Sequence, residues 1–239
     1  MTTGIMLTIG SLFLSILLII VFYSKSRIPS LENKIFGKII FINLFGVIMH
    51  ILCFVTNKLF PTDSIFVLLT AKLYLVYLIL WATYFTWYVF VISNDKFREK
   101  KINYILWFVI VVATYLIYKL DISFYVSSSE IYSYGASVKV VYVLVSCYYV
   151  AWTLLLLGNI KNIIKKIYIP IFSFMILGGV ATIIQRNFPG VQLMTFLETF
   201  IGYLMYFTIE NPDMKLLKEM HEAKEISDNA NEEKTLFLY

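Results

Sequence analysis

Cysteine is scarce in this chain, and so are the residue patterns that enzymes and metal proteins use. Only Cys53 and Cys147 are present, both inside apolar runs, which excludes a disulfide framework. The two histidines, His50 and His221, are far apart and are expected on opposite sides of a membrane, so they cannot form a metal pair. There is no phosphate-cradling glycine-rich loop, metal-ligand cluster or nucleophile elbow. We therefore predict no catalytic residues, no metal and no cofactor in this chain.

Charge is also sparse. Charged residues make up 15% of the 239 positions, hydrophobic residues make up 60%, and the mean hydropathy is +0.80. This composition is typical of a polytopic membrane protein. The net charge of +5 does not indicate nucleic-acid binding, because the basic residues cluster between apolar runs. The first apolar run has no basic residue before it and no cleavage pattern after it, so it is interpreted as an uncleaved span.

Seven apolar runs are long enough to cross a bilayer as helices, which takes ~20 residues. They cover residues 4–23, 35–57, 65–93, 102–120, 140–160, 168–184 and 191–209. The third is the longest and should tilt or protrude, and the sixth is the shortest and contains Gly178 and Gly179. The prediction is an all-α polytopic membrane protein, with a seven-span membrane domain over residues 1–210 and a cytosolic helix over 211–239.

Basic residues are distributed unevenly between the two sets of loops. Eleven lie in or beside the loops after the first, third and fifth runs: Lys25, Arg27, Lys34, Lys38, Lys96, Arg98, Lys100, Lys101, Lys161, Lys165 and Lys166. The opposite set holds four: Lys58, Lys119, Lys139 and Arg186. The positive-inside rule then places the N-terminus outside and the tail in the cytoplasm, in agreement with an odd number of spans.

The longest loop on the predicted outer side covers residues 121–139. Its β-branched and aromatic residues around a serine-rich centre are compatible with a small hairpin over the outer mouth of the bundle, or with an irregular loop. Neither a fixed-period repeat nor a matching pair of interrupted spans is visible, which argues against a transporter built from inverted repeats.

Three ionisable residues fall within the predicted spans, where they are expensive unless paired or hydrated: His50, Lys72 and Glu198. Lys72 and Glu198 have opposite charge and lie at similar depth, about two turns from the outer ends of their spans. Our hypothesis is that they pair, and that with His50, Gln185 and Arg186 they line an outward-facing pocket for a small-molecule or peptide ligand. The alternative is that Lys72 snorkels to the outer interface.

The third span carries an aromatic stripe. Its members are spaced three or four residues apart and therefore share one helical face. They are Tyr74, Tyr77, Trp81, Tyr84 and Tyr88. Because their polar atoms favour partners over lipid, the stripe is predicted to face the bundle interior, as a packing seam or as an aromatic ligand cage.

The seventh span has a polar face of small residues, which is the kind of surface that favours helix–helix contact in lipid. Its members are Thr195, Glu198, Thr199, Gly202 and Tyr206. This face couples the predicted pocket to the tail. The span contains no lysine, so retinal bound there as a Schiff base is not supported.

Glu210, Asn211 and Pro212 form the predicted signalling hinge. Asn can cap a helix, Pro suits its first turn, and the following Asp complements its dipole, so a new helix should leave the membrane here. Along that helix a heptad seam mixes apolar, small and polar residues: Leu216, Met220, Ala223, Ser227, Ala230, Lys234 and Phe237. Such a seam predicts a weak, switchable homodimer contact, and the alternative is a solvated helix that never pairs.

The tail also carries a family resemblance. Ala223-Lys224-Glu225, followed by Ala230-Asn231-x-x-Lys234-Thr235-x-Phe237-Leu238, resembles the helix that leads into the dimerisation module of bacterial sensor histidine kinases. Residues 132–138 and 198–217 are similar to seven-span regions of such kinases in Gram-positive bacteria. Glu233 departs from the family pattern, which usually has Ala there. His221 is not the phosphoacceptor, since it precedes the pattern.

The resemblance implies the sensory input domain of a two-component receptor in the bacterial cytoplasmic membrane. ATP and Mg²⁺ would belong to a kinase module outside these residues, and a response regulator would be its partner. The alternatives are a seven-span sensor with another output, such as a cyclase, a small membrane transporter or channel, or a membrane scaffold whose tail binds partners.

Overall fold

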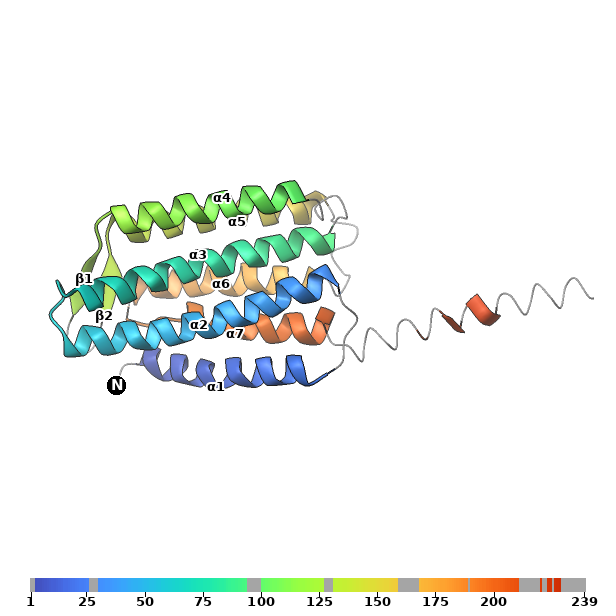
Figure 1. Ribbon diagram of the computed structural model, residues 1–239, viewed down its shortest axis with the longest axis horizontal. Helices are drawn as coiled ribbons and strands as arrows, with labels where there is room; N and C mark the ends of the chain where they lie inside the picture. Colours follow the sequence, from blue (N-terminus) through green and yellow to red (C-terminus); the bar gives the residue numbers. More distant parts are fainter. Residues whose placement is uncertain are drawn as a thin grey trace, which may run out of the picture.

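The computed structural model describes residues 3–25, 30–93, 100–126, 131–158, 168–188 and 190–210, together with residues 220, 223–224 and 226–228 of the tail. Seven helices form an antiparallel bundle (Figure 1): α1 Thr3–Ser24, α2 Leu31–Leu59, α3 Ile65–Ser93, α4 Lys100–Lys119, α5 Ala136–Gly158, α6 Ile169–Asn187 and α7 Met194–Met205. Helix α7 continues as a π-helix, η4, over Tyr206–Glu210. We call the end where α2 finishes and α3 begins the hairpin end, and the end where η4 finishes the tail end.

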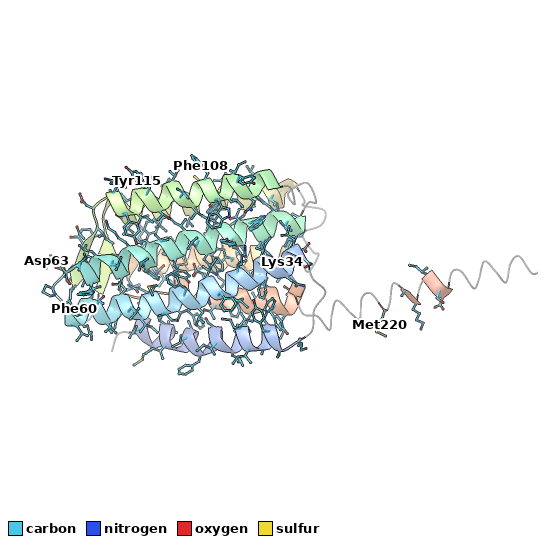
Figure 2. All side chains as sticks on the ribbon, viewed as in Figure 1. Lys34, Phe60, Asp63, Phe108, Tyr115 and Met220 are labelled. Atoms are coloured by element: carbon cyan, nitrogen blue, oxygen red, sulfur yellow. The ribbon has the colours of Figure 1, made fainter. Side chains whose placement is uncertain are left out.

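Six of the seven helices, α1 to α6, are long and apolar enough to cross a membrane. Their outward faces carry large apolar side chains that a water-soluble protein would bury. On α4, for example, Phe108 is 69% exposed and points away from the bundle together with Tyr115 (Figure 2). The chain is therefore a multi-pass membrane protein by length and composition of its helices. The seventh predicted run also forms a helix, but α7 has only 12 residues before the change to η4.

Helix α3 lies in the middle of the bundle, where it packs against α2, α4 and α5. Helix α7 packs against α1, α2 and α6. The stripe on α3 looks into the bundle, as its spacing predicts: Tyr77, Trp81, Tyr84 and Tyr88 are buried, and Tyr74 packs against the same core. This core runs the length of the bundle.

Toward the tail end the core is dominated by four rings, which we call the aromatic cluster: Trp81, Phe85, Trp152 and Phe174. The Trp81 and Phe85 rings stack with centroids 5.1 Å apart, and Phe174 lies 5.0 Å from Trp81. The Trp152 indole N–H donates to Thr86 Oγ1 at 3.1 Å. The cluster thereby joins α3, α5 and α6.

A β-hairpin lies at the other end, between α4 and α5 (Figure 1). Strands β1, Ser123–Val126, and β2, Ile131–Tyr134, pair antiparallel, so the loop is a hairpin and not irregular. Gly135 follows with a φ of 117°, which favours glycine, and a Cβ there would lie 3.0 Å from the Asp121 carbonyl oxygen. The Ser137 hydroxyl then donates to the Leu120 carbonyl at 2.8 Å. These contacts fix the hairpin over the end of the bundle.

Candidate functional site

Ten polar side chains from four helices meet inside the half of the bundle nearer the hairpin. Most are fully buried in an otherwise apolar interior, where polar groups require hydrogen-bond partners. We call them the polar network: Thr8, Ser11 and Ser15 on α1, Asn43 and His50 on α2, Tyr74 and Tyr77 on α3, and Thr195, Glu198 and Thr199 on α7. His50 and Glu198, two of the three ionisable residues predicted to matter, belong to it.

His50 joins α2 to α1 and to the start of α7. Its Nδ1 lies 3.1 Å from the Thr8 hydroxyl and 3.0 Å from the Thr195 hydroxyl. Its Nε2 hydrogen-bonds to Gln192 Oε1, which fits the tautomer with the proton on Nε2 and leaves Nδ1 to accept from a neighbouring hydroxyl. The ring also stacks on Tyr74, with centroids 4.7 Å apart. His50 is therefore bound to α1, α3 and the start of α7.

Asn43 is the junction of the network. Its Nδ2 donates to Ser15 Oγ at 2.8 Å and to Thr199 Oγ1 at 2.9 Å. Its Oδ1 lies 3.4 Å from the Tyr77 hydroxyl. A single amide thereby connects four helices, α1, α2, α3 and α7.

Glu198 is 4% exposed, and its Oε2 is hydrogen-bonded to the Tyr77 hydroxyl. A phenol has one proton, so Tyr77 cannot donate to Glu198 and Asn43 at once. An ionised Glu198 would accept the Tyr77 proton. A protonated Glu198 could instead donate to Tyr77, which would then donate to Asn43. The chemistry of these three groups thus permits two alternative hydrogen-bond arrangements.

Gly46 on α2 makes room for this tyrosine. A Cβ at position 46 would overlap the Tyr77 ring, so only glycine lets the ring lie against α2. The close approach brings the Tyr77 hydroxyl within reach of both Asn43 and Glu198.

The predicted ion pair between Lys72 and Glu198 is wrong. Lys72 Nζ donates to the carbonyls of Tyr118 at 2.9 Å and Leu120 at 3.1 Å, where it satisfies the C-terminal end of α4. On α3, Lys72 and Tyr77 are five residues apart, which places them about 140° apart around the helix axis. The side of α3 that faces Glu198 is therefore not the side that carries Lys72. Lys72 Nζ extends to the hairpin end of α4, so the alternative that Lys72 snorkels to the outer interface stays a prediction.

Gln185 and Arg186 lie in the last turn of α6, where Arg186 is exposed. Within the described part of the chain, neither has a hydrogen bond to His50 or Glu198. The segment between α6 and α7 contributes Gln192 instead, from the non-helical residues just before α7. Sequence reasoning missed Gln192 because it looked for charge inside helices. The sequence feature that could have identified it is the position of this amide side chain, three residues before Thr195 on the polar face of α7.

A small cavity of about 40 Å³ adjoins His50 beneath the hairpin. It is lined by residues of α2, α3, both strands and the segment before α7, among them His50, Asn57, Tyr74, Phe124, Tyr132 and Gln192. Asn57 is 5% exposed, and its Nδ2 donates to the Cys53 carbonyl at 2.8 Å. Among the described residues, its Oδ1 has no hydrogen-bond partner.

An unpaired buried amide oxygen costs about 1–3 kcal/mol, so Asn57 Oδ1 favours any donor that enters the cavity. The volume suits a group of a few non-hydrogen atoms, or a few waters. Aromatic rings from α3 and the hairpin would cover its apolar part. The cavity therefore fits a small donor-bearing group, in direct contact with His50.

The polar face of α7 connects this region to the tail end. Thr195, Glu198, Thr199, Gly202 and Tyr206 are all buried, as their spacing predicts. After Met205 the helix widens into η4, and the Thr208 hydroxyl donates to the Leu204 carbonyl at 2.6 Å. π-Helical turns are uncommon and frequently accompany functional sites.

The predicted hinge and seam fall mostly beyond this point. Glu210 is the last residue of η4, and Asn211 and Pro212 lie outside the described residues. In the seam, Met220, Ala223 and Ser227 are helical and exposed. The other seam positions also lie outside the described residues: Leu216, Ala230, Lys234 and Phe237.

Comparisons of the chain with protein-family models, curated proteins and solved structures give no match. The resemblance to sensor histidine kinases therefore stays a prediction, and the case for function rests on the site.

Proposed function

We propose that this chain is the membrane sensory domain of a two-component sensor histidine kinase. A stimulus at the hairpin end changes the packing of α7, and the tail transmits the change to a kinase module. One observation carries the proposal. The polar network holds the start of α7 to α1, α2 and α3 through Thr195, Glu198 and Thr199, and α7 runs on into η4.

We take α7 and η4 together as the seventh span. Residues 194–210 would extend about 25 Å at 1.5 Å per residue, close to the ~30 Å hydrocarbon core. With seven spans, the two ends of the bundle lie on opposite sides of the membrane. Lys25, Lys34 and Lys38 lie at the tail end, which supports a cytoplasmic tail and an outward-facing hairpin in a bacterial cytoplasmic membrane.

The stimulus in this proposal is a small molecule, or one group of a peptide, that enters the cavity beneath the hairpin. A donor on the ligand would bond to Asn57 Oδ1 and displace the contacts around His50. Since His50 bonds to Gln192 and Thr195 on either side of the start of α7, the ligand would favour one packing of α7 over the other. This is a population shift between two states of the bundle.

The output is proposed from the resemblance of the tail. The seam from Leu216 to Phe237 would pair two copies of the chain, and rotation or sliding of α7 would change that pairing. ATP and Mg²⁺ would be bound by the kinase module, and the phosphoryl group would pass to a response regulator.

Cross-linking of single cysteines along the tail tests this mechanism. In a background with Cys53 and Cys147 replaced by serine, cysteines at seam positions 220, 223 and 227 should cross-link faster than those at 221, 224 and 228. Gln192→Leu removes the acceptor from His50 and should shift the pattern without any ligand. Thr153→Val is the matched control, because among the described residues its exposed hydroxyl bonds to the Tyr149 carbonyl of its own helix.

Equal cross-linking at all six positions, or a pattern that Gln192→Leu leaves unchanged, would contradict the proposal. The reading frame after codon 239 tests the output separately. A histidine within a few residues, followed by an ATP-binding module, is expected. A cyclase there would favour the other sensor class, and substrate flux in liposomes would favour a transporter.

A further inference from the structure

A second and larger concavity lies at the tail end, away from the polar network. It is a groove of about 590 Å³ between the last turn of α1, the first turns of α2 and Trp87 of α3. Three lysines line it, Lys25, Lys34 and Lys38, and none of the described residues that line it is acidic. The groove therefore combines a concentrated positive charge with an apolar wall.

Lys34 and Lys38 lie one turn apart on α2, so their side chains leave the helix on the same face. Both are exposed, and Figure 2 shows Lys34 at this end of the bundle. Lys38 Nζ lies 5.7 Å from the ring centre of Tyr84 and 5.9 Å from that of Trp87. These rings hold the ammonium group at the mouth of the groove.

The N-terminus of α2 adds to this field. Ser30 caps the helix by accepting from the Asn33 N–H at 3.1 Å, and it lines the groove with Asn33. The dipole of a helix favours an anion at its N-terminus, and phosphate is a common occupant of such positions. Glu32 also lies in this first turn of α2, but it does not line the groove. Ser30, Lys34 and Lys38 all line it.

The rest of the groove is apolar and aromatic. Phe22, Tyr23, Phe41 and Trp87 line it, and Phe41 is also exposed on the outer face of α2. Tyrosine and tryptophan are the residues that gather at the boundary between lipid headgroups and hydrocarbon. A molecule in the groove would therefore contact lysines on one side and aromatic side chains on the other. This matches the boundary of a membrane, where charged headgroups meet the hydrocarbon core.

We infer that this groove binds the headgroup of an anionic phospholipid. The phosphate lies between Lys34, Lys38 and the N-terminus of α2, and an acyl chain runs along Phe41. Basic pockets between membrane helices bind phosphorylated lipid headgroups in this way. The inference is independent of the sensory function proposed above.

The test uses the full chain in phosphatidylcholine nanodiscs, titrated with a fluorescent phosphatidylglycerol. Each lysine beside an anionic lipid contributes about fivefold in affinity, so Lys34→Gln with Lys38→Gln should weaken binding about 25-fold. The matched control is Lys58→Gln with Lys119→Gln, which removes the same charge from exposed lysines at the hairpin end. It should change binding less than threefold.

Folding is checked by thermal unfolding in phosphatidylcholine alone, where both double variants should match the parent. An equal loss in the two double variants would overturn the inference, because it would show only general charge attraction. Unchanged binding in Lys34→Gln with Lys38→Gln would also overturn it. Displacement of phosphatidylglycerol by millimolar glycerol phosphate would overturn it in favour of a soluble phosphate ligand, since only a lipid needs Phe41.

Discussion

The two halves of the bundle are joined by different kinds of interaction. Toward the hairpin, α1, α2, α3 and α7 meet through the directional hydrogen bonds of the polar network. Toward the tail end, α3, α5 and α6 meet through the four rings of the aromatic cluster. Ring packing is spread over many weak contacts, whereas a hydrogen-bond network has discrete arrangements.

This difference separates a scaffold from a part that can move. The aromatic cluster contains no residue of α7, while the polar network contains three. A stimulus that rearranges hydrogen bonds would therefore shift α7 against a frame that stays packed. The following variants test whether the aromatic cluster is the rigid scaffold and the polar network the part that can rearrange.

The largest effect is expected at Trp81, whose side chain is fully buried. Trp81→Ala should lower the free energy of unfolding by about 3–5 kcal/mol, because it removes a large ring from the centre of the cluster. Unfolding in detergent, followed by circular dichroism, measures this loss. Trp81→Phe should be much milder, since the indole N–H has no partner among the described residues. If Trp81→Ala were as stable as the parent, the aromatic cluster would not be the scaffold of the bundle.

Gly46→Ala tests how tightly the network is built against α2. The new methyl group would overlap the Tyr77 ring and should cost about 1–3 kcal/mol of stability. Gly10→Ala is the control, because nothing lies within 4 Å of a Cβ at that position of α1. There the better helix propensity of alanine should be neutral or stabilising by up to about 1 kcal/mol. Equal effects at both positions would show that the close approach of Tyr77 is unimportant.

A double-mutant cycle on Tyr77 and Glu198 measures the coupling inside the network. Tyr77→Phe should cost about 1–2 kcal/mol, because it removes the buried hydroxyl that bonds to Glu198 and lies within reach of Asn43. Glu198→Gln alone keeps a polar group in place. A coupling energy of at least about 0.5 kcal/mol is expected between the two changes. Simple additivity would mean that the Tyr77–Glu198 bond does not tie α3 to α7.

The smallest effect is expected at Lys72, which lies outside both regions. Lys72→Met removes two hydrogen bonds to the end of α4 from a partly exposed site, and should cost about 1 kcal/mol or less. The cross-linking pattern of the tail should not change. If Lys72→Met lowered the free energy of unfolding as much as Tyr77→Phe, or changed the cross-linking pattern of the tail, Lys72 would belong to the functional site after all.

Run length and helical period predicted much of the fold from the sequence. Apolar length predicted seven spans, and six of the helices are long and apolar enough to cross a membrane. Spacing predicted the inward faces of α3 and α7. Span positions also placed Lys72 and Glu198 at similar depth, but depth says nothing about direction around a helix axis. Their pairing therefore failed, and Tyr77 took the place assigned to Lys72. The role of Gln192 depends on its contact with His50, 142 residues away, which local pattern does not encode. Nothing in the sequence pattern predicted the change from α7 to η4.

The hairpin has a consequence for timing. Phe124, Tyr132 and Ser133 form part of the wall of the small cavity, and Gly135 and Ser137 tie the hairpin to the end of α4. In the sensory function proposed above, a ligand would have to pass this covering both to enter and to leave the cavity. Its exchange would then be slower than free diffusion, and the domain would respond to lasting exposure and not to brief fluctuations in concentration.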